Sequence, residues 1–72
     1  MKKVMKIQGM MCQHCVAHAT KALLAVDGVD GVEVSLQDGT ATVVSAIELA
    51  DETLAAAIVG AGYEVLGIET TK

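Results

Sequence analysis

Residues 2–16 read KKVMKIQGMMCQHCV, and within this stretch the spacing of apolar side chains changes from one period to another. Across residues 2–8 side chains alternate, with Met5 and Ile7 on one side, which is typical of a half-buried strand. After the second cysteine, apolar residues recur at helical spacing. The sequence therefore predicts a strand over residues 2–8, a short loop that contains the first cysteine, and a helix over about residues 13–26.

The rest of the chain alternates between the same two periods. The inward stripes of the two helices are expected to be Val16, Ala19, Leu23 and Val26 in the first, and Leu54, Ala57, Ile58 and Ala61 in the second. The predicted elements after the first helix are a strand with Val32, Val34 and Leu36, a two-residue hairpin at Asp38-Gly39, a returning strand with Ala41 and Val43 inward, a helix from Asp51 to Gly62, and a strand over residues 63–69.

This order of elements predicts an α+β fold, a ferredoxin-like βαββαβ open-faced sandwich with a four-stranded antiparallel sheet and two helices on one face. Residues 1–72 are expected to form one domain.

The composition of the chain argues against several classes of function. The net charge is −4, and the basic residues are five lysines with no arginine, which argues against binding to nucleic acid or to anionic membranes. With one Tyr and no Phe or Trp, the core must be small and leaves little room for a buried substrate pocket. The longest apolar run, residues 54–63, is too short to span a membrane.

The first residues resemble the start of a signal peptide, but Lys6 and Gln8 interrupt the apolar run that should follow. We therefore expect a cytoplasmic protein. In that compartment a close pair of cysteines is more often metal-binding or catalytic than a permanent disulfide. A disulfide in the metal-free, oxidised protein remains an alternative.

The two cysteines stand three positions apart, with Cys12 in the loop and Cys15 in the first turn of the helix. Unpaired backbone N–H groups in a first helical turn stabilise the negative charge of a thiolate. Structural zinc takes four protein ligands, and only His14 or Met11 stand beside these thiols. Two thiolates instead suit Cu(I), a soft ion that accepts low coordination numbers. Because such an ion has room for a further ligand, thiols of another protein could replace the two cysteines.

Three segments together resemble a heavy-metal-associated domain, and in particular the small bacterial copper chaperones of the CopZ type. They are Gly9-Met10-Met11-Cys12-Gln13-His14-Cys15, Asp38-Gly39 and Ala61-Gly62-Tyr63-Glu64-Val65. The resemblance implies that Cys12 and Cys15 bind Cu(I). It also implies delivery to the metal-binding domain of a copper-transporting P-type ATPase or to a copper-responsive repressor, and no catalysis.

The resemblance also suggests roles for the neighbouring residues. Met10 matches a methionine that packs under the loop, and Tyr63 matches an aromatic residue beside the metal, although capping the core would equally explain a ring there. Met11 departs from the usual Thr or Ser, and the absence of Asp there disfavours zinc; its thioether is expected to shield the site more than to bind. His14 is a candidate third or bridging ligand, or a bystander, whereas His18 is expected to be a surface residue.

Other functions use the same residues. A mercury or zinc/cadmium carrier, or a detached metal-binding domain of a P-type ATPase, would have this cysteine pair too. A thiol–disulfide oxidoreductase is disfavoured because the chain has no proline for the cis-proline of a thioredoxin-like site. We expect a monomer without metal, with a copper-bridged dimer left open. Four lysines form either a basic docking area or an ordinary solvated face: Lys2, Lys3, Lys6 and Lys21.

Overall fold

The computed structural model describes residues 1–9 and 13–71. The elements along the chain are β1 (Lys2–Gln8), α1 (Gln13–Leu24), β2 (Val29–Ser35), β3 (Thr40–Ser45), α2 (Asp51–Gly60) and β4 (Glu64–Thr71). The predicted order of elements is confirmed. Neither of the two described helices is long and apolar enough to cross a membrane.

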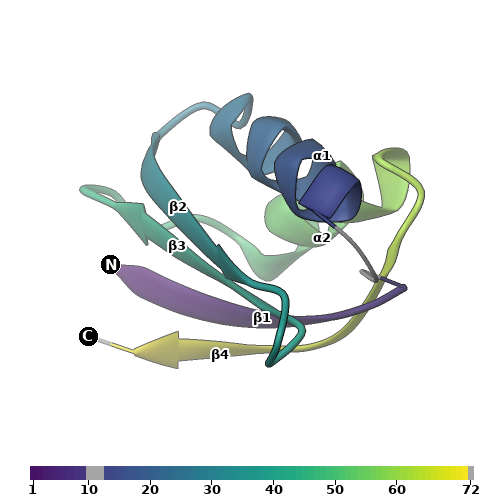
Figure 1. The fold of residues 1–72 in the computed structure, drawn as a ribbon. Helices are drawn as coiled ribbons and strands as arrows, with labels where there is room; N and C mark the ends of the chain where they lie inside the picture. The colour runs from purple at the N-terminus through teal and green to yellow at the C-terminus, as the bar shows by residue number, and fades with distance from the viewer. Residues whose placement is uncertain (10–12, 72) are drawn as a thin grey trace.

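The four strands form one sheet in the order β2-β3-β1-β4, and every neighbouring pair is antiparallel. β1 is central, so that Met5 pairs with Ala41 of β3 on one side and with Ile68 of β4 on the other. Both helices cover the same face of the sheet, and no element that the structure describes covers the other face (Figure 1). This is the ferredoxin-like sandwich that the sequence predicts.

The core lies between the sheet and the two helices. Its buried apolar residues are Met5, Ile7, Ala19, Leu23, Ala41, Val43, Leu49, Leu54 and Ile58. The strand members stand at alternate positions of β1 and β3, and the helix members are four residues apart in each helix, as the two periods require. The predicted inward residues Met5, Ile7, Ala41 and Val43 are thus confirmed. Leu49, in the connection between β3 and α2, was not among the predicted core residues.

α1 ends earlier than predicted. Its last residue is Leu24, and the expected end at Val26 lies in a turn in which the Val26 N–H donates to the Leu23 carbonyl over 3.1 Å. The chain then reverses at Gly28, whose φ of +95° belongs to the region that glycine adopts without strain. Val26 still packs against the core from this turn.

The hairpin between β2 and β3 is longer than predicted. The sequence predicted a two-residue turn at Asp38-Gly39, but Ser35 pairs with Thr40 and four residues lie between them. The Gly39 N–H closes the turn on the Ser35 carbonyl over 2.9 Å, with Gly39 at a φ of +68°. Leu36 therefore belongs to the turn and not to the strand. A longer turn with a left-handed glycine at its end is a common alternative to the two-residue hairpin.

α2 begins at Asp51, where acidic residues in the first turn complement the helix dipole. The helix ends at Gly60, two residues before the predicted end, so Ala61 is its C-cap and not part of the inward stripe. The reversal at Gly62, with a φ of +99°, leads into β4. β4 runs from Glu64 to Thr71, one residue later at its start and two later at its end than the predicted range 63–69.

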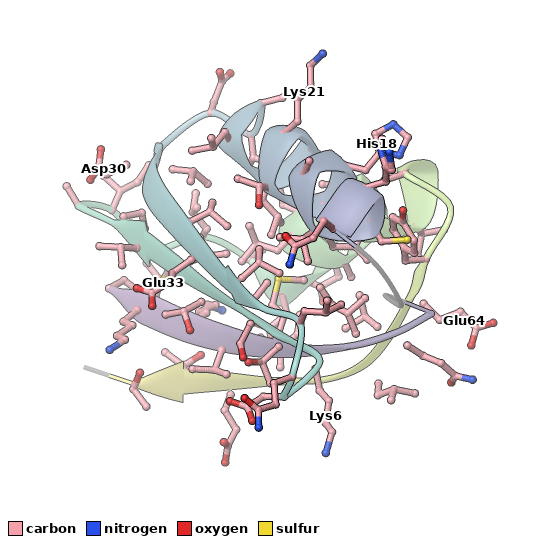
Figure 2. The ribbon with its side chains drawn as sticks, viewed as in Figure 1. Lys6, His18, Lys21, Asp30, Glu33 and Glu64 are labelled. Carbon is pink, nitrogen blue, oxygen red and sulfur yellow. The ribbon has the colours of Figure 1, made fainter. Side chains whose placement is uncertain are left out.

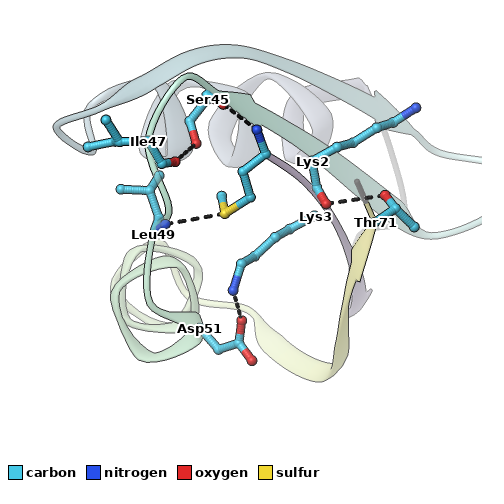
Figure 3. Close-up of polar contacts among 8 residues, drawn as sticks. Lys2, Lys3, Ser45, Ile47, Leu49, Asp51 and Thr71 are labelled. Carbon is cyan, nitrogen blue, oxygen red and sulfur yellow. Dashed lines mark hydrogen bonds and ion pairs between the residues drawn. The ribbon is translucent and has the colours of Figure 1, made fainter.

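Lys3 is the polar exception on the buried face of β1. Its side chain is 7% exposed, and its ammonium pairs with Asp51 at the start of α2 (Figure 3). The same end of the sandwich is linked to the first residue, because the amino group of Met1 donates to the Ser45 carbonyl over 2.7 Å. These contacts join β1 to the segment that leads into α2.

Candidate metal centre

The described part of the predicted site begins where β1 ends. Gly9 follows β1 with a φ of +96°, and α1 starts at Gln13. A left-handed residue at this position turns the chain away from the sheet toward the helix, and glycine adopts it at little cost. Met10, Met11 and Cys12 lie outside the described residues, so the expectations for them stay predictions.

Cys15 stands in the first turn of α1, as predicted. It is partly buried and packs against the core, as does its neighbour Val16. The side chain of Cys15 is therefore held against the body of the domain. In the first turn, N–H groups without helical partners create a field that favours negative charge on sulfur.

His14 and His18 are both exposed, one turn apart on α1. Figure 2 shows His18 projecting from the helix away from the sheet. The expectation that His18 is a surface residue is confirmed. Both histidines line one open hollow of about 320 Å³, together with Ala17 and Lys21. The spacing of four residues places the two histidines on one face of the helix.

Tyr63 lies beside the loop and also against the core. A Cβ atom placed on Gly9 would stand 3.7 Å from Cδ1 of the Tyr63 ring, which is ordinary van der Waals contact. The ring is half-buried and packs on the core, and the Tyr63 N–H donates to the Ile58 carbonyl over 3.2 Å. The ring therefore packs on the core and lies near Gly9, and its place beside the metal stays a prediction.

Within residues 1–9 and 13–71, no three side chains of His, Cys, Asp or Glu gather around one point. The donors described at this end are the Cys15 thiol and the His14 imidazole. One soft and one borderline donor do not complete a tetrahedral zinc site. Cys12, three positions before Cys15, lies outside the described residues, so a second thiolate at this end stays a prediction.

The lysines do not form one basic area. Lys3 is buried and paired with Asp51. Lys6 projects from the uncovered side of the sheet, while Lys21 projects from α1 on the opposite side of the molecule (Figure 2). Of the two alternatives for these lysines, one basic docking area made of all four is therefore wrong, because the alternation of β1 and the position of α1 distribute the charges over separate surfaces.

Comparison with known families gives one match that covers most of the chain. Residues 4–64 match the model of the Heavy-metal-associated domain. The match includes both cysteines, α1, the hairpin and α2.

Three relatives represent the kinds of protein that the chain resembles. A mercuric reductase of Acidithiobacillus ferrooxidans is 46% identical over 59 residues, which are 82% of this chain and 11% of that protein. A copper-transporting ATPase 2 of Rhizobium meliloti is 45% identical over 62 residues, 85% of this chain and 8% of that protein. The copper chaperone CopZ of Bacillus subtilis is 35% identical over 65 residues, 89% of this chain and 94% of that protein. The chain thus spans about a tenth of the mercuric reductases that it matches.

Solved structures share the fold over nearly the whole chain. A CopZ metallochaperone matches with a TM-score of 0.86 and 30% identity, covering 92% of this chain and 100% of that one. Oxidised MerP from Ralstonia metallidurans CH34 matches with a TM-score of 0.87 and 25% identity, covering 97% of each chain.

Proposed function

The chain belongs to the heavy-metal-associated domain family, and on that premise we propose that it carries Cu(I) between proteins in the cytoplasm, with residues 1–72 acting as one domain. Cys12 and Cys15 bind the ion as thiolates. The observation that carries the proposal is the position of Cys15, which lies in the first turn of α1, packs against the core and stands three positions after Cys12. The near full-length similarity to a copper chaperone supports this choice of metal.

Two thiolates leave a cuprous ion with room for a third ligand. A thiolate of the acceptor attacks the ion, a three-coordinate intermediate forms, and one thiolate of the carrier leaves. Each step exchanges one sulfur for another, so no free ion is released. His14, exposed beside Cys15, is proposed as an occasional third or bridging ligand.

The proposed acceptor is the metal-binding domain of a copper-transporting P-type ATPase or a copper-responsive repressor. Similarity to a copper-transporting ATPase supports the first, because two domains of one fold can present their cysteine pairs to a shared ion. We propose no catalytic step for this domain itself.

The ligand assignment is tested by anaerobic titration with Cu(I) against a chromophoric Cu(I) chelator. Cys12→Ser and Cys15→Ser should each lose tight binding, because a single thiolate remains. Gln13→Ala is the matched control, since Gln13 is exposed in the same segment and offers no soft donor. Wild-type affinity in either cysteine variant would refute the assignment. Gel filtration at each copper ratio then shows whether copper bridges two copies.

The second candidate is a mercury carrier or the metal-binding part of a longer mercury-processing protein. The identity of 46% to a mercuric reductase favours it, and Hg²⁺ shares the preference for two thiolates. Deletion of the gene distinguishes the candidates. Impaired growth on copper salts alone supports the copper carrier, whereas impaired growth on mercury salts alone contradicts it.

A further inference from the structure

We propose that His14 and His18 form a second metal site on α1, which binds a borderline divalent cation such as Ni²⁺, Zn²⁺ or Cu²⁺ without help from the cysteines. The two imidazoles are exposed and line the same hollow of about 320 Å³. This inference does not depend on the proposed transport of Cu(I).

The spacing of the pair suits chelation. Residues four apart on a helix lie one above the other, with Cβ atoms roughly 5–6 Å apart. Two imidazole nitrogens that share an ion at about 2.0–2.1 Å must approach one another to roughly 3 Å. Because both histidines are exposed, rotation about their side-chain torsions can bring the nitrogens from the Cβ spacing to this shorter distance. Imidazole is a ligand that Zn, Cu and Ni all accept.

The surroundings leave space for the ion and its water ligands. Ala17, which also lines the hollow, is too small to block either ring. α1 is a regular helix of 12 residues, Gln13–Leu24, whose face toward the sheet is fixed by buried Ala19 and Leu23. The backbone therefore holds the two imidazoles at a constant spacing, and a preorganised pair loses less entropy on binding than two unrelated ligands.

Lys21 opposes this site. Its side chain lines the same hollow, and its positive charge lowers the affinity for a cation. Removing this charge therefore tests whether the ion binds beside Lys21. Lys21→Gln should strengthen the binding of a divalent cation at the histidine pair by several-fold at low ionic strength.

The experiment uses a chain that carries Cys12→Ser and Cys15→Ser, so that no thiolate competes. Titration with Ni²⁺, followed by calorimetry, should show one ion per chain. His14→Ala and His18→Ala should each lower the affinity by about tenfold or more, which is the effect of losing one of two ligands. The variant His18→Ala/Lys21→His is the control and is compared with His18→Ala/Lys21→Gln, because both lack the Lys21 charge and the first keeps two histidines seven residues apart, too far to share an ion.

These measurements distinguish the histidine site from the proposed cysteine site. Equal Ni²⁺ affinity with and without His18, or no Ni²⁺ binding in the cysteine-free chain, would overturn the proposal. A loss of Cu(I) binding in the cysteine variants concerns only the proposed function. If the double serine variant folds poorly, Cys12→Ala/Cys15→Ala is used, so that no thiolate remains. In that chain, paramagnetic broadening by Ni²⁺ of the His14 and His18 ring protons must occur together for the proposal to stand.

Discussion

Lys3 occupies a position on β1 that alternation assigns to the buried face, in line with Met5 and Ile7. Its aliphatic stem lies inside the sandwich, and its ammonium meets Asp51, whose side chain is 52% exposed. A long basic side chain can cover apolar surface in this way while its charge remains near water. Asp51 also stands in the first turn of α2, where the helix dipole favours a carboxylate with or without a lysine.

The stem of Lys3 should therefore contribute more to stability than its charge. Lys3→Ala removes three buried methylene groups and should lower the free energy of unfolding by about 2 kcal/mol. Lys3→Met keeps the stem and should stay within about 1 kcal/mol of the wild type. Urea denaturation measures both, with exposed Lys6→Ala as the control, expected within about 0.5 kcal/mol. An equal loss in Lys3→Met and Lys3→Ala would mean that the ion pair dominates.

At the scale of elements, the connection from α1 to β2 depends on a close contact with the connection from β3 to α2. A Cβ atom on Gly28 would lie 2.7 Å from Cδ1 of Ile47 and 3.2 Å from Cδ2 of Leu49. Gly28 also has a φ of +95°, which L residues with a side chain rarely adopt. Two separate effects thus restrict this position to glycine.

Gly28→Ala should lower the free energy of unfolding by about 1–3 kcal/mol, from backbone strain and from the displaced Ile47 side chain. Gly31→Ala in β2 is the control, because a Cβ atom there has no neighbour within 4 Å and its φ is ordinary, so no loss is expected. The double variant Gly28→Ala/Ile47→Ala separates the causes by thermal or urea unfolding. If Ile47→Ala rescues the whole loss, backbone strain contributes nothing.

At the scale of the whole molecule, the two predicted copper ligands are close in sequence, and this limits how much metal can stabilise the fold. A ligand that binds only the native state at about 1,000 times its Kd adds roughly 4.1 kcal/mol. An unfolded chain can also bring Cys12 and Cys15 to one ion, because they are three residues apart. The net stabilisation by Cu(I) is the difference between its binding free energy to the native chain and its binding free energy to the unfolded chain.

Cu(I) should therefore raise the Tm, but by less than its affinity for the native protein would give alone. Each 1 kcal/mol corresponds to about 4–8 °C in a domain of this size. Anaerobic thermal unfolding with and without one equivalent of Cu(I) measures the shift, and Cys12→Ser should show none. A lower Tm with copper would mean that the unfolded chain binds the ion better, which contradicts a preformed site at the start of α1.

The candidate site illustrates what sequence patterns can and cannot predict. The cysteine pair, and the position of Cys15 at the start of a helix, follow from residues within one short stretch, so local periodicity found them. The nearness of Tyr63 to Gly9 could not come from periodicity, since the two residues are separated by most of the chain and meet only when β1 pairs with β4. Resemblance to a family supplied that expectation instead.

The sequence by itself determined the order of strands and helices, the inward residues of β1 and β3, and the place of Cys15 in the first turn of α1, because each depends on side chains a few positions apart. The tertiary structure alone decided that Lys3 is buried against Asp51, that Leu49 joins the core, and that the turn before β3 has four residues. These features depend on pairing register and on contacts between distant segments. The spacing of apolar residues within one segment does not predict which distant residue will pack beside a given side chain.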